Sequence, residues 1–230
     1  MKDWSVGMML APRGGESYFE RTLSSVKEAG WEDLTVFAEP ESPPVLNQTV
    51  VKRPSKLGNW LNFRESLIDM YSEDSEKKYY MLIEDDVVFS KNVRQFLDIA
   101  LWPSNTGVCS IYSPSHYETF ERVGWNNHSG TTMWGAVTMI FSNKSLQCFI
   151  NHYNNIEWNS DQNCDNAVGR WCERTEQNAY FFSPSLVQHV GVKSSLGDKR
   201  YHRRRYSSLF VGEDFDCTKL LYGDGNDKFE

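Results

Sequence analysis

Three consecutive acids, Glu84, Asp85 and Asp86, lie between two apolar runs in the stretch YYMLIEDDVVFS (79–90). Neighbouring carboxylates repel one another, so three in a row are unfavourable in the interior of a strand. Because side chains alternate along an extended segment, we expect Glu84 and Asp86 to face one side and Asp85 the other. Two carboxylates that converge at a strand end form a hard-oxygen site suited to Mg²⁺ or Mn²⁺. A solvated acidic turn is the alternative interpretation.

Three residues far from this triplet in the sequence could complete such a site. His189, in PSLVQHVG, could supply a neutral imidazole nitrogen as a third metal ligand, although a lone histidine is more often structural. Arg13, in APRGG, could hold a diphosphate with its guanidinium fork. Glu39 could accept a hydrogen bond from a nucleobase or a ribose hydroxyl. For Arg13 and Glu39, an ordinary surface charge is the alternative.

A second pair of acids, Asp161 and Asp165, is spaced to lie on one face of a helix. Like charges one turn apart cost helix stability, which favours a functional reason for them. One of the two could be the general base that deprotonates an acceptor hydroxyl. The alternative is that Asp161 simply caps the helix N-terminus.

The elements that would position these residues follow an alternating pattern in the first 90 residues. Apolar runs predict strands, and apolar residues at helical spacing predict helices. The expected order is strand 4–10, helix 16–30, strand 34–39, helix 58–71 and strand 79–83. Alternating strands and helices imply a parallel sheet with helices on its faces. Ligands bind such sheets beyond the carboxyl ends of the strands, where the acid triplet lies.

The second half of the chain has a less regular pattern. A long loop is expected over 116–135, and a helix over 160–174 with Ser160 or Asp161 as its cap. The other expected elements are helix 93–101, strand 107–113, strand 136–142, helix 143–153 and two extended pieces, 179–183 and 185–191. A basic stretch and an acidic tail follow. The sequence contains no internal repeat or clear linker, so we expect a single domain.

Composition limits the classes of protein to consider. The chain has 230 residues, of which 40% are hydrophobic, so it can bury a core. Its formal charge of −7 argues against nonspecific binding to nucleic acid by the whole surface. It has no apolar run of membrane-spanning length and no recognisable signal peptide, and its five cysteines are odd in number. We therefore expect a cytoplasmic protein with free thiols and no membrane span.

Several stretches together resemble a known family. MLIEDDVVFS is similar to the DxD motif of glycosyltransferases with the GT-A fold, in its Glu-x-Asp form. Four further stretches resemble the type IV branching N-acetylglucosaminyltransferases and their soluble bacterial or phage relatives: APRGGESYFERTLSSV, KLGNWLNFRESL, SDQNCDNAVGRW and SPSLVQHVGVKSSLG. The blocks occur in the family's order and cover roughly residues 5 to 199. The last block is the most specific of them.

The resemblance implies a GT-A fold, which is an α/β architecture with a Rossmann-like, mostly parallel central sheet and helices on both faces. It implies a nucleotide-binding half over about 1–90 and an acceptor and catalytic half over about 91–198, followed by a basic loop and acidic tail over 199–230. The implied reaction is transfer of a sugar from a UDP-sugar donor to a hydroxyl acceptor, with Mn²⁺ or Mg²⁺ on the diphosphate. The transfer would be inverting, by direct displacement.

The resemblance also assigns residues to roles. Asp86, Glu84 and His189 would be the metal ligands, and Asp161 is favoured over Asp165 as the base. The residues expected to contact the nucleotide sugar are Pro12, Arg13, Glu39, Lys56, Asn62, Glu84, Asp85, Trp134, Gly135 and Lys199.

A basic stretch follows the region of resemblance and leaves the acceptor open. Five cations are clustered there: Lys199, Arg200, Arg203, Arg204 and Arg205. They could form a solvated loop, a lid over the donor diphosphate, or a contact to a polyanionic acceptor. The acceptor could thus be a glycan, a glycoconjugate, or DNA carrying a hydroxymethylated pyrimidine, whose base would have to be flipped out. A nucleotidyltransferase and an inactive sugar-nucleotide-binding module are the further alternatives.

Overall fold

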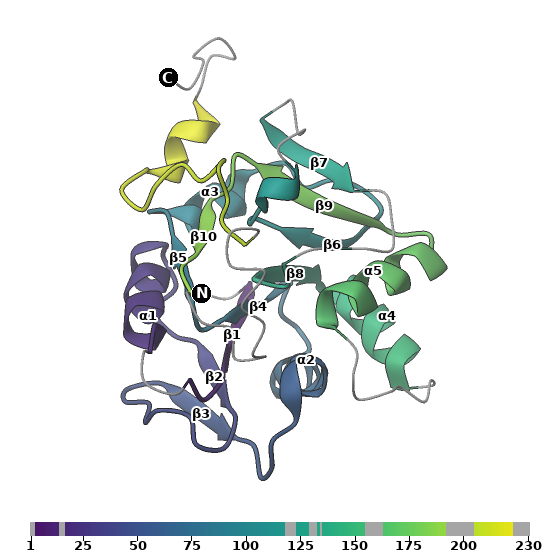
Figure 1. Ribbon diagram of the computed structural model, residues 1–230. Helices are drawn as coiled ribbons and strands as arrows, with labels where there is room; N and C mark the ends of the chain where they lie inside the picture. The colour runs from purple at the N-terminus through teal and green to yellow at the C-terminus, as the bar shows by residue number, and fades with distance from the viewer. Residues whose placement is uncertain are drawn as a thin grey trace.

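The protein is built around an eight-stranded sheet with the strand order β3-β2-β1-β4-β8-β6-β9-β7 (Figure 1). The computed structural model describes residues 3–13, 17–117, 123–128, 133, 135–154, 163–191 and 205–222. The strands are β1 (Trp4–Leu10), β2 (Thr35–Ala38), β3 (Thr49–Lys52), β4 (Tyr79–Glu84), β6 (Thr106–Ser110), β7 (Gly124–His128), β8 (Thr138–Ser142) and β9 (Asn178–Ser183). The neighbours β3, β2, β1 and β4 are parallel, whereas β8 runs antiparallel to both β4 and β6. Beyond β8, β6 and β9 are parallel and β7 is antiparallel to β9, so the sheet is mostly parallel.

A second, two-stranded sheet lies next to the carboxyl end of β4. It pairs β5 (Val87–Phe89) with β10 (Val187–His189) in antiparallel orientation. Because β5 begins directly after the acid triplet, the register places His189 opposite Val87, the residue that follows Asp86. This pairing brings the two ends of the predicted site together.

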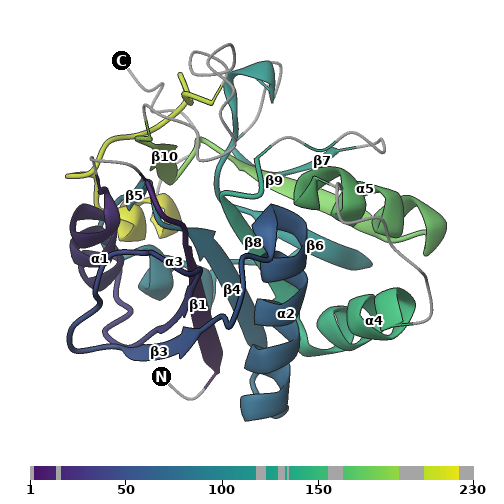
Figure 2. The same cartoon turned by 60° about the horizontal axis from the view of Figure 1, so that its bottom comes forward.

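Helices cover both faces of the main sheet, as the two views in Figures 1 and 2 show. The helices are α1 (Phe19–Glu28), α2 (Gly58–Glu73), α3 (Val93–Ile99), α4 (Asn143–Asn154) and α5 (Cys164–Arg174), with short 3-10 turns η1 (Ser115–Tyr117) and η3 (Cys217–Leu221). Side chains of α1 and α3 join one core cluster, and those of α2, α4 and α5 join the other. The fold is therefore three layers, as a parallel sheet buried on both faces requires.

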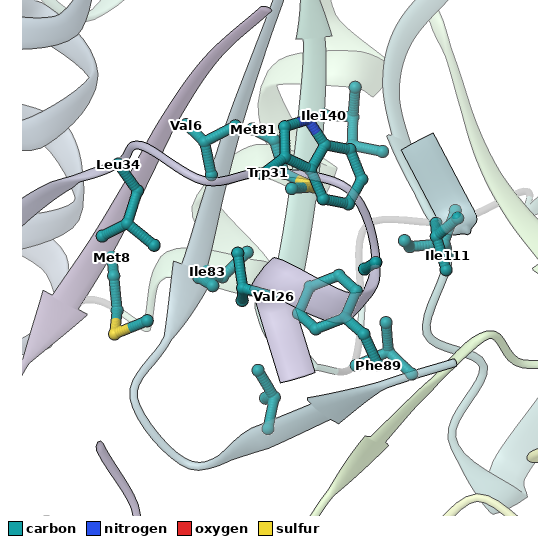
Figure 3. Packing of buried hydrophobic residues seen from close by; sticks show 14 of the residues in the cluster. Val6, Met8, Val26, Trp31, Leu34, Met81, Ile83, Phe89, Ile111 and Ile140 are labelled. Atoms are coloured by element: carbon teal, nitrogen blue, oxygen red, sulfur yellow. The ribbon is translucent and has the colours of Figure 1, made fainter. Parts of the chain in front are cut away.

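Strand β4 shows how one strand serves both cores. Met81 and Ile83 lie in the cluster with α1 and α3, whereas Tyr80 and Leu82 lie in the cluster with α2, α4 and α5. Figure 3 shows the first cluster, in which Trp31, from the loop after α1, is surrounded by residues of α1, β1, β4 and β8. Alternation along the strand therefore places apolar side chains on both sides, and the acids begin where the apolar cover ends.

The predicted fold class is confirmed, and three strands were missed. Strand β3 lies in a segment without a predicted element, and β5 is only three residues long. The expected loop over 116–135 is wrong in part, because Gly124–His128 forms β7. The expected cap of the last helix is also wrong: Asn163, in extended conformation, occupies the N-cap position, so α5 begins at Cys164.

The described part of the C-terminal segment, residues 205–222, is integrated into the fold. Ser185 pairs with Phe210, and Lys91 pairs with Asp216, in isolated parallel bridges. In Figure 1 this yellow segment runs beside β10 and α3. All five cysteines are free thiols, as expected. No helix among the described residues has both the length and the apolar character needed to cross a bilayer.

Candidate functional site

The candidate metal ligands converge at the junction of the two sheets. Glu84 ends β4, Asp86 lies in the turn to β5, and His189 ends β10. One potential ligand atom from each of the three lies within 4.8 Å of the other two. His189 Nε2 is 3.1 Å from Asp86 Oδ2. The prediction that Glu84 and Asp86 face one common point is therefore confirmed.

An open oxygen in this cluster fits a divalent cation. Asp86 Oδ1 is buried without a hydrogen-bond partner among the described residues, and His189 Nε2 lies beside the other oxygen of the same carboxylate. A buried polar atom without a partner is costly unless something else binds it. Two carboxylates and an imidazole suit Mn²⁺ or Mg²⁺, with further positions left for phosphate oxygens. These residues therefore fit the cation that the family resemblance implies.

Gly191 gives the cluster the space it occupies. A Cβ atom at Gly191 would lie 2.0 Å from Asp86 Oδ2, far closer than any real contact. Val190, between this glycine and His189, donates its amide hydrogen to the carbonyl oxygen of Asp86 at 2.9 Å. The glycine of the QHVG block is thus required because the backbone passes directly against the metal-binding carboxylate.

Arg13, from the loop after β1, binds the second and third acids of the triplet. Its Nη2 donates to Asp85 Oδ1 at 2.5 Å, and its Nη1 lies 2.9 Å from Asp86 Oδ2. Asp85 Oδ2 also accepts a hydrogen bond from the amide of Ala11 at 3.3 Å. The middle acid therefore faces the end of β1, and Arg13 bridges it to Asp86.

The electrostatics of the triplet differ from one acid to the next. Burial, and next the charge of Asp86, raise the pKa of Glu84. Burial also acts to raise the pKa of Asp86, but His189, Arg13 and Arg205 together outweigh it, so the pKa of Asp86 is lowered. Asp86 is thus held as an anion, which is the form that a metal ligand needs.

Helix α1 fixes the backbone of the acidic turn. The hydroxyl of Thr22 donates to the carbonyl oxygen of Asp85 at 2.9 Å and accepts from the amide of Val87 at 3.1 Å. Thr22 is completely buried. One side chain thereby satisfies two backbone groups of the turn that no strand pairs, which keeps the acids in place.

The other candidate base, Asp165, lies in the first turn of α5. Its Oδ2 accepts from the amide of Gly135 at 2.9 Å, while its buried Oδ1 has no hydrogen-bond partner among the described residues. Burial raises the pKa of Asp165. Gly135 has a φ of +85°, and a Cβ there would lie 2.6 Å from the ring of Tyr112. The glycine therefore lets its loop pass directly against Tyr112, in a position from which its amide binds the Asp165 carboxylate.

Arg205 is the described residue of the predicted basic stretch, and its charge acts on the whole site. The charge of Arg205 acts to lower the pKa of Glu84, Asp86 and Asp165, whereas burial, the largest single cause at each, acts to raise it. Its carbonyl oxygen accepts from the hydroxyl of Tyr112. The site therefore combines the metal-ligand cluster, Asp165 and two arginines. The sequence did not distinguish Arg205 from its basic neighbours.

Reciprocal hydrogen bonds hold the segment that carries Arg205 against β10. Gln188 Nε2 donates to the carbonyl oxygen of Ser207, and the amide of Ser207 donates back to Gln188 Oε1, both at 2.9 Å. Gln188 is the residue directly before His189. Its side chain therefore ties the metal-ligand strand to the segment 205–211.

Two other predicted site residues have structural partners. Both oxygens of Glu39 accept hydrogen bonds from the amides that begin α2, those of Leu57 and Gly58, at 3.0–3.1 Å. Asn62, inside α2, accepts from Arg53 at 2.9 Å. Their expected contacts with a nucleotide stay predictions. Lys56 is exposed and Pro12 half-buried. Asp161, Trp134 and Lys199 lie outside the described residues, as do Arg200, Arg203 and Arg204.

Comparison with known proteins adds evidence on the fold. The sequence matches no protein-family model and no curated protein. Among solved structures, 410 chains match, and a fold this common does not by itself specify an activity. One is a nucleotidyl transferase from Methanothermobacter (Mth528), which is 12% identical, with a TM-score of 0.52 over 79% of this chain and 87% of that one. The chain is thus an α/β protein with a mostly parallel sheet, compatible with a Rossmann-like nucleotidyltransferase or GT-A fold.

Proposed function

We propose that the protein is a metal-dependent glycosyltransferase that moves a sugar from a UDP-sugar donor to a hydroxyl group. The observation that carries this proposal is the convergence of Glu84, Asp86 and His189 beside two arginines and a separate buried carboxylate. A divalent cation bound there would neutralise the charge that develops on the leaving diphosphate. Arg13 and Arg205 supply fixed positive charge to the same group.

Asp165 is the proposed general base within the described residues. Its Oδ2 is fixed by the amide of Gly135, and its Oδ1 is left to accept a proton. In the proposed step, Asp165 takes the proton of the acceptor hydroxyl, whose oxygen forms a bond to the anomeric carbon. The bond from that carbon to the diphosphate oxygen breaks, and the electron pair leaves with UDP. Attack opposite the leaving group inverts the configuration. Asp161, outside the described residues, stays the competing prediction for this role.

Nucleotidyl transfer is the second candidate, because a nucleotidyl transferase shares the fold. Its nucleophile is typically a phosphate oxygen, which is already an anion at neutral pH and needs no base. A sugar hydroxyl does need one. The second carboxylate beside the metal-ligand cluster, Asp165, therefore favours glycosyl transfer. The acceptor would be a glycan, a glycoconjugate or a hydroxylated DNA base, and the chain's charge of −7 weighs against DNA.

Identification of the leaving group separates the two activities. The protein would be incubated with a panel of UDP-sugars, and separately with nucleoside triphosphates and sugar phosphates, with and without Mn²⁺. We expect Mn²⁺-dependent release of UDP from one UDP-sugar. Release of pyrophosphate from a nucleoside triphosphate would instead establish nucleotidyl transfer. Binding of UDP-sugar with neither product, across glycan and hydroxymethylated-DNA acceptors, would support a binding module.

A further inference from the structure

One oxygen of the acid triplet is shared by two nitrogen groups. Asp86 Oδ2 lies 2.9 Å from Arg13 Nη1 and 3.1 Å from His189 Nε2. It is also the oxygen against which the backbone of Gly191 is packed. Asp86 Oδ1 is open, but Oδ2 is the oxygen that lies beside His189 Nε2, so a cation held between Asp86 and His189 would meet an oxygen that Arg13 already binds. Arg13 and the metal ion are rivals for the same atom.

The middle acid holds Arg13 by a different set of contacts. Asp85 accepts from Arg13 Nη2 at 2.5 Å and from Nε at 3.4 Å, so the guanidinium is gripped along one edge. Asp85 is only 3% exposed. It is not among the three residues whose ligand atoms converge. A two-point grip of this kind fixes the plane of a guanidinium as well as its position.

We propose that Asp85 is a positioning residue that keeps Arg13 beside Asp86 as the internal counter-ion of the acid cluster. With a divalent cation bound, Arg13 Nη1 would give up its contact with Asp86, and Asp85 would retain the guanidinium. The displaced Nη1 donor then binds a phosphate oxygen of the donor. This inference rests on the metal site of the proposed function and assigns a separate task to the third acid. Two acids bind the metal, and the third holds the arginine that takes its place.

The mechanism predicts opposite effects on two ligands from one substitution. In Arg13→Gln, the rival cation is gone, so Mn²⁺ alone should bind about 10-fold more tightly. UDP in the presence of saturating Mn²⁺ should bind about 10-fold more weakly, because a charge-assisted bond to phosphate is lost. Isothermal titration calorimetry measures both affinities without any need for turnover. Arg21→Gln, which removes an exposed arginine of α1, is the matched control and should change neither.

A double-mutant cycle tests the role of Asp85. Asp85→Asn loosens the grip on Arg13 and leaves the arginine to Asp86, so Mn²⁺ binding should weaken. If Asp85 acts through Arg13, the Arg13→Gln/Asp85→Asn protein should bind Mn²⁺ as tightly as Arg13→Gln alone. If Asp85 acts only as one more negative charge, the loss should persist unchanged in the double variant, and this result would overturn its positioning role.

Other outcomes also decide the proposal. Unchanged or weaker Mn²⁺ binding in Arg13→Gln would overturn the rivalry while leaving the metal site intact. Wild-type protein that binds no Mn²⁺ would overturn the proposed function together with this inference. Thermal melts followed by circular dichroism identify any variant that fails to fold. Should Asp85→Asn fail in this way, the Arg13→Gln titrations decide the rivalry, and Arg13→Lys, which keeps the charge without the fork, tests the grip.

Discussion

Two buried acids at the same edge of the sheet, Glu39 and Asp86, have opposite surroundings. Glu39 follows β2 and Asp86 lies just beyond β4, with exposed fractions of 6% and 1%. Both oxygens of Glu39 are occupied by amides of α2, whereas Asp86 has one oxygen without a partner among the described residues and the other between Arg13 and His189. Burial and position are therefore shared, and the number of open oxygens separates a helix cap from a candidate ligand.

Asp165 resembles Asp86 in having one open oxygen. One of its oxygens accepts from Gly135 and the other has no partner within the described part of the chain. A carboxylate that is both anchored and partly open matches the needs of a base, which must be oriented and must still accept a proton. Asp86 and Asp165 therefore each have one open oxygen, whereas Glu39 has none, and substitutions can test what this difference means.

The largest effect should come from Asp86, the open acid that lies in the candidate metal cluster. We expect Asp86→Asn to lower turnover about 10³-fold or more, because a cation on the leaving group is worth several kcal/mol. Mn²⁺ binding by calorimetry should be lost in parallel. Asp214→Asn is the matched control, since its side chain is 97% exposed and pairs with Lys91 on the surface. Full activity of Asp86→Asn in EDTA would break the comparison.

Asp165→Asn should lower turnover about 10²-fold while leaving UDP binding intact, because it removes a base and no metal ligand. Because the pKa of Asp165 is raised, its deprotonated form appears at a higher pH than that of an ordinary aspartate. The acidic limb of the pH profile of kcat/KM should therefore lie above the ordinary aspartate pKa. If the acidic limb of the wild-type profile lies at the ordinary aspartate pKa, or if Asp165→Asn is fully active, the general base would be Asp161 instead.

The raised pKa of Asp165 also makes the free energy of unfolding depend on pH. The folded state holds the Asp165 proton more tightly than the unfolded state does. This group therefore favours folding below the unfolded pKa, and the contribution is lost as the pH rises through the folded pKa. Asp165→Asn should remove that loss, which unfolding in urea at a series of pH values would detect.

Gly191→Ala tests whether space keeps Asp86 open. The added methyl group must displace the carboxylate or the backbone, so Mn²⁺ affinity should fall about 10-fold. Overpacking should also lower the free energy of unfolding by about 1–3 kcal/mol. Gly212→Ala is the control for a methyl group added without a clash, because nothing lies within 4 Å of where a Cβ at Gly212 would be, although its positive φ adds backbone strain that Gly191 does not have. Equal Mn²⁺ affinities of the two variants would refute the steric argument.

The smallest effect should be that of Glu39→Gln. Loss of the charged cap at α2 should lower the free energy of unfolding by about 1 kcal/mol, or the melting temperature by about 2–4 °C. UDP and Mn²⁺ affinities should stay unchanged. If UDP binding weakens at unchanged stability, Glu39 is a nucleotide contact, as the sequence predicted, and the contrast with Asp86 fails.

The elements with strong local patterns could be predicted from the sequence. Strand β1 was expected over its observed bounds, and α2 within two residues of its end, because apolar residues recur at strand and helix spacing. Strand β5 was missed because it has three residues and pairs with β10, far along the chain. Strand β3 was missed because it has four residues, of which the two at its ends are exposed. Strand β7 was missed because GWNNH has polar residues at most positions.

Some features of the candidate site could likewise be predicted from the sequence, and others could not. The acid triplet and His189 were predicted, since carboxylates at a strand end have a chemical meaning in the sequence alone. The pairing of Asp85 with Arg13 was not, because 72 residues separate them and either acid beside Asp85 could have been the partner. The hydrogen bonds of Glu39 depend on where two backbone amides at the start of α2 lie, and the sequence does not indicate the position of backbone amides.

The hydrogen bonds between Gln188 and Ser207 affect the order in which contacts can form during translation. Ser207 follows Gln188 by 19 residues, so a ribosome that adds about 5–20 residues per second needs about 1–4 s to supply the partner. During that interval the nascent chain already carries every candidate metal ligand, but His189 lacks the segment that fastens its strand. The hydrogen bonds between Gln188 and Ser207 can therefore form only after Ser207 has been synthesised, whereas the pairing of β10 with β5 needs no later residue.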